Sequence, residues 1–313
     1  MRLFITGGSG YLGKHLIKHY YNKADITIFS RDEAKQFLIK QQYPDVKCVL
    51  GDVRNYDSLL RAMRQYWPTH AVFAASMKHI DACRDNYQEA NDIIVKGAFN
   101  SRQAAEECGV DAACFISSDK SRAATTIYGS MKYTAGEAFI TNPTDMKVNT
   151  LVYGNVMNST GSIIPKIWET IRSNTNSYGR YLSLYHSDMT RFLYDIKDAV
   201  SLIDYALSPE APNGTTMVPY IKSFKIIDLF NLYTQQFGLT WNLSSPRPGE
   251  KLHEILISKE EWARTTEDPY RSLYFIHNDF QNKLNFDTDF SSRDYCISKT
   301  ELKMYLEQNG WFK

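Results

Sequence analysis

The feature that most constrains the fold is a glycine pattern directly after the first apolar run of the chain. Residues Arg2–Thr6 read as a short strand, and a helical pattern runs over Lys14–Tyr21. Between them stand Gly7, Gly10 and Gly13. Glycines at this spacing let the backbone turn tightly and approach a pyrophosphate, while the helix start offers free N–H groups. A strand-turn-helix corner can use glycine for packing alone, but a strand before and a helix after favour a nucleotide site.

Strand and helix patterns then alternate through the first half of the chain. Ile26–Phe29, Val46–Leu50, Ala71–Ala75 and Ala112–Ile116 read as strands, and a helical pattern covers Asp92–Cys108. Alternation at this interval indicates right-handed crossovers and a parallel sheet, with ligands at the carboxyl ends of the strands. We therefore predict an α/β fold: a Rossmann doubly wound parallel sheet with a smaller, interleaved α/β substrate lobe.

The end of the second predicted strand favours NADP over NAD. An acidic residue there would bind a ribose diol and disfavour a 2′-phosphate, but Ser30 and Arg31 come first and Lys35 follows a helical turn later. Asp32 weakens the inference, and Arg31 and Lys35 could instead be ordinary surface charges. The expected cofactor-binding residues are Gly7, Ser9, Gly10, Tyr11, Leu12, Gly13, Ser30, Arg31, Lys35, Asp52, Val53, Ala74, Ala75, Lys78, Tyr128 and Lys132.

Two pairs of residues after the fifth strand carry the candidate chemistry. Tyr128 and Lys132 are four residues apart, so on a helix they share one face. A lysine ammonium beside a phenol favours the phenolate, which equips the tyrosine to take a proton from an alcohol. Asp119 and Lys120 lie just upstream, although alone they would suggest only a helix cap and a solvated charge.

Composition excludes several other classes of protein. The 313 residues carry 36 Lys+Arg against 35 Asp+Glu, a formal net charge of +1, which offers no electrostatic footprint for nucleic acid. The five cysteines are scattered without zinc-type spacing, so we expect reduced structural thiols and no metal site. The start of the chain lacks the pattern of a signal peptide, and no apolar run approaches a membrane span. A soluble, cytoplasmic protein that makes no membrane contact is expected.

Taken together, these stretches resemble the extended short-chain dehydrogenase/reductase superfamily, whose marks are TGGxGxxG and YxxxK. Within it the match is closer to the UDP-N-acetylglucosamine 4,6-dehydratases that invert C5, the first enzymes of pseudaminic acid and related L-sugar pathways. C5-retaining relatives carry Asp-Glu where this chain has Asp119-Lys120. The other stretches that carry the resemblance are Phe29–Gln36, Leu50–Leu59, Ala74–His79, Tyr153–Pro165, Met189–Phe192 and Arg247–Ile257.

The resemblance implies a reaction and a role for each residue. Hydride would pass from C4 of the sugar to NADP+ while Tyr128, with Lys132 beside it, removes the hydroxyl proton. Asp119 would protonate the departing 6-hydroxyl and Lys120 would act as the base at C5. Hydride would return to C6, and a proton delivered to the opposite face of C5 would give a UDP-4-keto-6-deoxy-L-hexosamine for a surface glycan. The resemblance also implies a homo-oligomer, a dimer or a hexamer.

The expected partner is a UDP-sugar. Arg247 can hold its diphosphate and Glu250 can accept from the uridine ribose, although the two could simply form a local ion pair. Lys78, Asn155 and Arg191 complete the predicted substrate site. We expect residues 1–155 to bind NADP, with 190–215 returning to that domain. Residues 156–189 and 216–313 should form the UDP-sugar-binding lobe and the C-terminal tail, with helices over 162–172, 226–237 and 299–306.

Departures from the family pattern leave the sugar open. Ile94, Val152 and Thr160 replace an asparagine and two arginines that are usual there, and Ala124-Thr125 stands where Asn-Pro is common. A UDP-hexose 4,6-dehydratase or an epimerase of other sugar preference is therefore an alternative. A catalytically silent protein that binds NADP and a UDP-sugar is a second alternative, which the complete set of catalytic residues disfavours.

Overall fold

The centre of the molecule is a nine-stranded sheet in the order β13-β14-β9-β6-β5-β4-β1-β2-β3. The computed structural model describes residues 1–173, 181–279, 284 and 286–312. The predicted lobe residues at 174–180, 280–283, 285 and 313 lie outside the described residues. The strands of the sheet are β1 (Arg2–Thr6), β2 (Asp25–Ser30), β3 (Lys47–Leu50), β4 (His70–Phe73), β5 (Ala112–Ile116), β6 (Lys147–Leu151), β9 (Thr215–Pro219), β13 (Thr265–Asp268) and β14 (Leu273–His277).

Strands β1 to β6 and β9 are parallel, whereas β14 runs antiparallel to β9 and to β13. Successive side chains of β1 alternate between the two faces, as strand geometry requires. Leu3 and Ile5 join one apolar core and Phe4 joins the other. A sheet buried on both faces is what near-continuous apolar strands predict. The doubly wound fold class is therefore confirmed.

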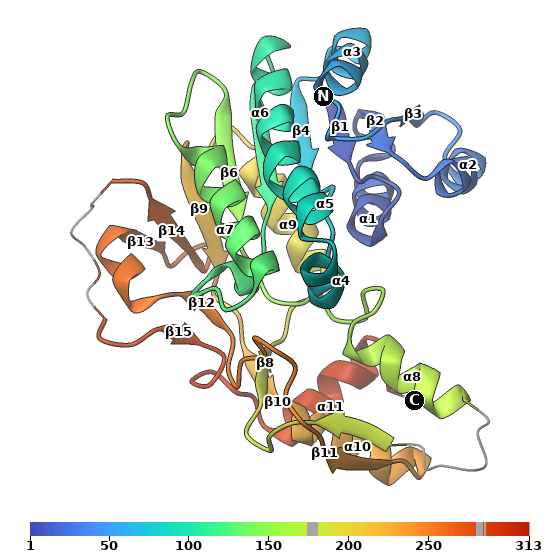
Figure 1. The fold of residues 1–313 in the computed structure, drawn as a ribbon, viewed down its shortest axis with the longest axis vertical. Helices are drawn as coiled ribbons and strands as arrows, with labels where there is room; N and C mark the ends of the chain where they lie inside the picture. Colours follow the sequence, from blue (N-terminus) through green and yellow to red (C-terminus); the bar gives the residue numbers. More distant parts are fainter. Residues whose placement is uncertain (174–180, 280–283, 285, 313) are drawn as a thin grey trace.

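Helices cover the two faces of this sheet (Figure 1). The first core packs against α1 (Tyr11–Tyr20) and α9 (Ile196–Ala206). The second lies beneath α3 (Tyr56–Tyr66), α6 (Gly97–Glu107) and α7 (Ile127–Ile140). The helix predicted over 92–108 starts as a π-helical turn, η1 (Asp92–Lys96), ahead of α6. The remaining helices of this half are α2 (Glu33–Gln42), α4 (Ile80–Asp85) and α5 (Tyr87–Asn91).

A smaller lobe with its own apolar core lies below the sheet in Figure 1, and the C-terminus lies in it beside α8. Its helices are α8 (Ile163–Arg172), α10 (Ile226–Phe237) and α11 (Lys299–Gln308), close to the three predicted. Three pairs of short strands lie outside the large sheet: β7 (Tyr181–Leu184) with β11 (Thr240–Leu243) in the smaller lobe, β8 (Thr190–Phe192) with β10 (Ser223–Lys225), and β12 (Ile255–Ile257) with β15 (Phe290–Ser291).

The segment 216–313 is shared between the two lobes. We predicted it as part of the smaller lobe, but most of β9 and all of β13 and β14 belong to the large sheet. The physical reason is that β14 extends the sheet by pairing with β9, so residues 265–277 cover an edge that would otherwise expose unpaired backbone groups. The stretch from Ile226 to Leu243 does lie in the smaller lobe, with α10 and β11.

The five cysteines are free, and Cys83, Cys108 and Cys114 are buried. Burial raises the pKa of each of these three thiols, which keeps them protonated and unreactive. Among the residues that the structure describes, every helix is too short or too polar to span a lipid bilayer.

Candidate active site

The loop between β1 and α1 has the shape of a nucleotide cradle. Gly7 has φ +68°, and a Cβ there would lie 2.9 Å from the backbone nitrogen of Ala75. A Cβ at Gly13 would lie 2.3 Å from the carbonyl oxygen of Gly8, so α1 can start this close only with glycine. Gly10 gives α1 no side-chain cap, and the first turn holds no acidic residue. A pyrophosphate fits this helix start by shape and by charge.

Ser9 and Ser30 join this cradle to the end of β2. Ser9 Oγ donates to Ser30 Oγ at 3.0 Å, and the buried amide of Gln36 donates to the same oxygen at 2.9 Å. The segments expected to hold the pyrophosphate and the adenosine ribose are therefore adjacent. Of the other predicted cofactor residues, Tyr11 and Leu12 open α1, Val53 is buried beside Gly97, and Ala74, Ala75 and Lys78 follow β4.

Carboxylates already surround the basic residues expected to select NADP. Lys35 Nζ lies 2.6 Å from Asp32, and Arg31 Nη1 lies 3.6 Å from Asp52. Asp52 also accepts from Arg54 Nε at 2.9 Å and Nη2 at 2.6 Å. Partial burial raises the pKa of Asp52, but these bonds bring it below its ordinary value. Asp52, one of the predicted cofactor-binding residues, is thus held by an arginine that we did not single out.

Asp119 and Lys120 begin a short 3-10 turn, η2 (Asp119–Ser121), directly beyond β5. Ser118 starts the turn, because its Oγ accepts from the backbone nitrogen of Lys120 at 3.3 Å. The Asp119 carboxylate is buried and accepts from Ser118 Oγ at 2.8 Å and from Lys120 Nζ at 3.1 Å. Burial raises the pKa of Asp119, and the charge of Lys120 offsets this only in part. A carboxyl with a raised pKa can act as an acid.

The ammonium of Lys120 lies among three oxygen atoms. Its Nζ is 3.1 Å from Asp119 Oδ1, 3.2 Å from Asn155 Oδ1 and 3.4 Å from Glu254 Oε1. Burial alone would lower the pKa of Lys120, but the two carboxylates raise it above its ordinary value. Lys120 is therefore charged at neutral pH in the absence of substrate.

Helix α7 brings Tyr128 and Lys132 next to this turn. Thr126 caps the helix by accepting from the backbone nitrogen of Gly129 at 3.1 Å. A Cβ at Gly129 would lie 2.2 Å from the carbonyl oxygen of Lys120, so the helix packs on η2 only through glycine. The helical register that we predicted from the spacing of Tyr128 and Lys132 is present.

The charges around Tyr128 and Lys132 differ from the expectation that the Lys132 ammonium favours the Tyr128 phenolate. Lys132 Nζ donates to the carbonyl oxygen of Ile116 at 2.7 Å and lies 4.7 Å from the centroid of the Phe115 ring. Burial lowers the pKa of Lys132 to about 7. Burial also raises the pKa of Tyr128 to about 12, and the charge that opposes this most is on Lys120.

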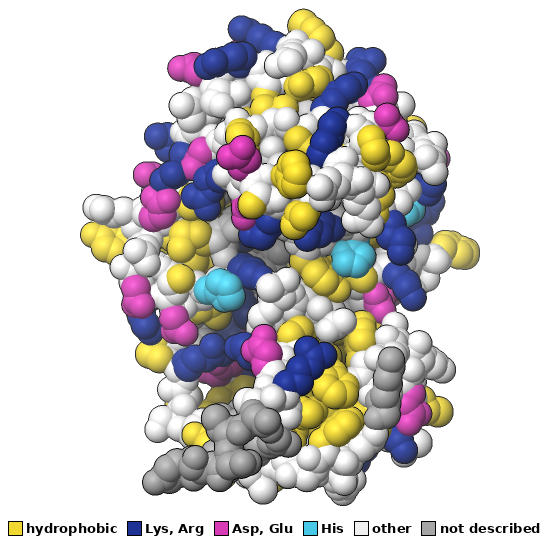
Figure 2. Space-filling model, turned by 90° about the vertical axis from the view of Figure 1, so that its right-hand side faces the viewer, with side chains coloured by type: hydrophobic (Ala, Val, Ile, Leu, Met, Phe, Trp, Pro, Cys, Tyr) yellow, Lys and Arg dark blue, Asp and Glu magenta, His cyan; other side chains and the backbone are white. Residues whose placement is uncertain are grey.

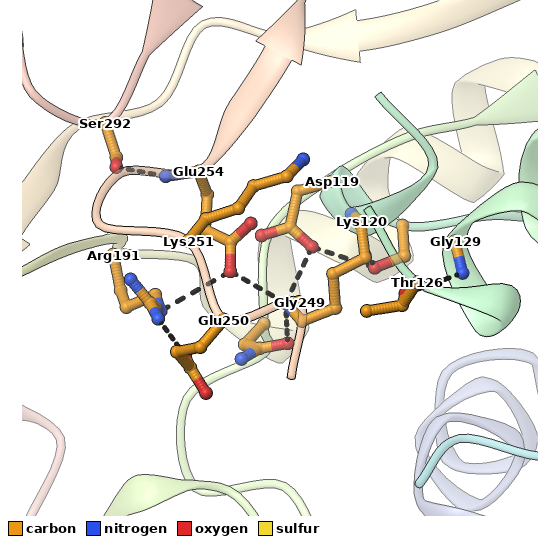
Figure 3. A network of polar contacts seen from close by, with 12 residues as sticks. Asp119, Lys120, Thr126, Gly129, Arg191, Gly249, Glu250, Lys251, Glu254 and Ser292 are labelled. Atoms are coloured by element: carbon orange, nitrogen blue, oxygen red, sulfur yellow. Dashed lines mark hydrogen bonds and ion pairs between the residues drawn. The ribbon is translucent and has the colours of Figure 1, made fainter. Parts of the chain in front are cut away.

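Arg191 in β8 links two glutamates near the turn (Figure 3). It forms an ion pair with Glu250, and its Nε lies 3.5 Å from Glu254 Oε1. Glu250 Oε2 also accepts from Arg247 Nη2 at 2.7 Å. Arg247 is 59% exposed, so this pair alone contributes little stability. The local ion pair between Arg247 and Glu250 that we considered is present, and both side chains line a cavity.

A cavity of about 700 Å³ lies between the two lobes. Figure 2 shows Lys and Arg side chains around the hollow between the upper and lower parts of the molecule. Apolar side chains such as Met157, Leu184 and Phe230 also line it. An apolar pocket with a few convergent charges is typical of a small-molecule site. The cavity also receives every predicted substrate residue, Lys78, Asn155, Arg191, Arg247 and Glu250, and two of the predicted catalytic residues, Lys120 and Tyr128.

Asp119 and Lys132 are buried behind the residues that line the cavity, 1% and 4% exposed. Ser118 lines the cavity and its hydroxyl joins Asp119 to it. Sequence reasoning missed Ser118 and Glu254. Glu254 lies inside the stretch 247–257 that we singled out, and a carboxylate directly before the apolar run Ile255–Ile257 is the signal that could have identified it.

The doubly wound sheet, the glycine loop after β1 and the Tyr-x-x-x-Lys helix after β5 are the arrangement of the extended short-chain dehydrogenases/reductases. The protein belongs to this class. Within it, the chain belongs to the family of polysaccharide biosynthesis proteins, whose sequence profile matches residues 3–276.

The curated relatives include enzymes with named activities. The chain is 31% identical over 299 residues to an inverting UDP-N-acetylglucosamine 4,6-dehydratase of Campylobacter jejuni, covering 92% of this chain and 86% of the relative. It is 32% identical over 292 residues to a UDP-glucose 4-epimerase of Rickettsia massiliae, covering 88% and 83%. The chain is thus related to UDP-sugar dehydratases and epimerases.

The crystal structure of Pen from Bacillus thuringiensis has a similar fold along the whole chain. The TM-score is 0.88 at 25% identity, with 99% of this chain and 98% of the other covered. Other solved structures of this fold contain NAD together with UDP or a UDP-sugar.

Proposed function

We propose that this protein is an NADP-dependent UDP-N-acetylglucosamine 4,6-dehydratase that inverts C5, giving a UDP-4-keto-6-deoxy-L-hexosamine for surface-glycan synthesis. The observation that carries the proposal is the contact between Asp119 and Lys120, 3.1 Å, next to the Tyr128 helix at one wall of the cavity. A simple dehydrogenase or epimerase needs the tyrosine but has no elimination step for an acid and a base to serve.

In the proposed reaction each catalytic side chain serves one proton transfer. The bound nicotinamide nucleotide supplies hydride acceptance from C4 and hydride return to C6. Tyr128 takes the proton of the 4-hydroxyl as a phenolate, so the phenol must first release its own proton to solvent, a loss that the charge of Lys120 favours. The 4-ketone acidifies the C5 proton, which Lys120 accepts as an amine, while Asp119 gives its proton to the departing 6-hydroxyl. After hydride returns to C6, a proton delivered to the opposite face of C5 completes the reaction and inverts that carbon. Ser118 connects Asp119 to the cavity, and the raised pKa of Asp119 suits a donor.

The choice of NADP is supported by the charges at the end of β2. Arg31 is 56% exposed, and its ion pairs with Asp52 and Glu89 are long, at 3.6 Å and 3.8 Å, so its guanidinium can leave them for a 2′-phosphate. We expect Arg31→Ala to weaken NADP binding by about tenfold and leave NAD binding almost unchanged, because a charge-assisted hydrogen bond contributes about 1.5–3 kcal/mol. Equal losses for both nucleotides, measured by calorimetry, would contradict this preference.

A UDP-sugar 4-epimerase is the second candidate, and the Rickettsia relative at 32% identity favours it. The first experiment separates the two. Purified protein is incubated with UDP-N-acetylglucosamine or UDP-glucose and catalytic NADP+ in deuterated water, followed by mass spectrometry and proton NMR. Loss of one water with deuterium at C5 and an L-configured ring supports inverting dehydration. An unchanged mass with inverted C4 supports the epimerase.

If neither sugar is altered, a binding protein without turnover becomes the better account. Faster turnover of UDP-glucose than of the N-acetyl sugar would shift the proposal to a UDP-hexose dehydratase. Assembly as a dimer or a hexamer stays a prediction, which light scattering of the purified protein tests.

A further inference from the structure

Glu254 is a buried carboxylate for which the proposed reaction has no role. It is 3% exposed and directly precedes β12. Its backbone is fixed on both sides by Ser292: the nitrogen of Glu254 donates to Ser292 Oγ at 2.9 Å, and its carbonyl accepts from the nitrogen of Ser292 at 2.9 Å. The side chain is thus held in place toward the η2 turn (Figure 3).

One oxygen of Glu254 serves two cations. Oε1 lies 3.4 Å from Lys120 Nζ and 3.5 Å from Arg191 Nε. Within the described residues, Oε2 is buried and has no hydrogen-bond partner. An unpaired buried oxygen is costly, and buried ion pairs are weak evidence for a stabilising role. The fold alone therefore gives little reason for a carboxylate here, whereas a link to Lys120 gives one.

We propose that Glu254 is the positioning residue of Lys120: it fixes Nζ between its own carboxylate and that of Asp119, and sets the pH at which Lys120 exchanges a proton at C5. This inference rests on the proposed function. It assigns Lys120 two states, an ammonium held by both carboxylates and an amine that accepts the C5 proton, with that proton released to solvent in each cycle because inversion requires the new C5 proton to arrive on the opposite face.

The charges around the pair determine the direction of the effect. Asp119 and Glu254 favour the Lys120 ammonium, while Arg191 disfavours it. Glu254 in turn faces Lys120, Arg191 and Lys251. Two further titratable groups interact with Lys120: Lys251, whose positive charge also disfavours the ammonium, and Tyr128, which is neutral below its raised pKa of about 12. Removing the charge of Glu254 should therefore lower the pKa of Lys120 and make the amine available at lower pH.

The test is Glu254→Gln, which keeps the size and one hydrogen-bond acceptor. The acidic limb of the pH–rate profile for C5 deuterium incorporation should move to lower pH by about one unit, and kcat should fall by about tenfold because Nζ is less well held. KM for the UDP-sugar should change less than kcat. A fall in kcat with the limb unmoved would overturn the inference, because a merely structural role predicts that result.

Glu261→Gln is the matched control. Glu261 is also buried and pairs with arginines, at 2.5 Å from Arg122 and 3.2 Å from Arg264. The Glu261→Gln variant should be less stable than the wild type, but the acidic limb of its pH–rate profile should not move. Glu254→Asp retains the charge with a shorter reach, so it should keep the limb near its wild-type position while kcat falls; this variant also serves if Glu254→Gln does not fold.

A titration without substrate separates this inference from the proposed function. The protein is labelled with 15N-lysine, and the NMR signal of Lys120 Nζ is assigned by its absence from the spectrum of Lys120→Met. A lower titration midpoint in Glu254→Gln supports the inference even if the wild type dehydrates no sugar, an outcome that would remove only the proposed function. An unchanged midpoint in an active enzyme would remove only the inference.

Discussion

Among single residues, Tyr128 is the one whose replacement should affect turnover most directly. Tyr128→Phe removes the only group at this position that can accept the proton of the 4-hydroxyl, so turnover should fall by about 10²–10⁴-fold. The side chain stays in the second core, so unfolding free energy should change by less than about 1 kcal/mol. Product formation by NMR and urea unfolding measure both quantities. Wild-type turnover in the variant would remove Tyr128 from the mechanism.

The buried Lys132 should make the stability of the folded protein depend on pH. Burial lowers its pKa from 10.5 to about 7 in the folded protein, so between these values the unfolded chain binds more protons. Stability then rises with pH across that window, and the penalty of the buried charge is full below pH 7. Lys132→Met should therefore stabilise the protein without cofactor on the order of a few kcal/mol at pH 6, and progressively less toward pH 10.

Urea unfolding of both proteins at several pH values checks this difference. A gain in stability that stays constant from pH 6 to pH 10 would contradict the lowered pKa. The variant should also lose turnover, which separates the catalytic use of Lys132 from its cost to the fold.

The sequence could identify residue types but not the tertiary contacts that set their charge state. Helical spacing predicted the shared face of Tyr128 and Lys132. It did not predict that the Lys132 ammonium points to the Ile116 carbonyl or that Lys120 opposes the raised pKa of Tyr128. Glu254 reaches Lys120 from the position before β12, which is distant along the chain. A contact between residues this far apart is not encoded in any local pattern.

Among the secondary-structure elements, the close packing of α7 on η2 should be required for turnover. Gly129→Ala places a methyl group 2.2 Å from the Lys120 carbonyl oxygen, and backbone cannot yield cheaply, so helix and turn must separate. We expect turnover to fall by about 10²-fold, because misplacement by about 1 Å has that effect. Ser130→Ala, on an exposed position of the same helix, is the control and should retain activity. A Gly129→Ala variant with normal kcat would show that this contact is not needed.

Elements whose pattern is local were predicted closely, and those that depend on distant pairing were not. Helix α10 spans the predicted residues 226–237 because its apolar face is continuous in sequence. Strands β13 and β14 gave no clear pattern, and their place in the large sheet follows from pairing with β9. The predicted fold class is therefore confirmed, whereas residues 265–277, predicted in the smaller lobe, belong to the large sheet.

At the scale of the whole molecule, the cavity takes side chains from both lobes and from segments far apart in the chain. Lys78 follows β4 of the large sheet, whereas Arg191 lies in β8 and Arg247 in the loop before β12. Lys78 Nζ also donates to the carbonyl of Thr160 at 2.6 Å, so the loops of the two lobes already touch across the cavity. A ligand that neutralises these cations should therefore stabilise both lobes together.

We expect UDP alone to raise the melting temperature in a single transition, since a ligand at 100 times its Kd adds about 2.7 kcal/mol. Arg247→Ala should weaken UDP binding by about tenfold, a modest loss because Arg247 is 59% exposed and screened by solvent. Arg293→Ala is the matched control: Arg293 is equally exposed, pairs with Asp294 and lies outside the cavity lining. Calorimetric titration with UDP compares the three proteins. If both variants bind UDP like the wild type, the diphosphate does not contact Arg247; if both weaken equally, the effect is one of overall charge.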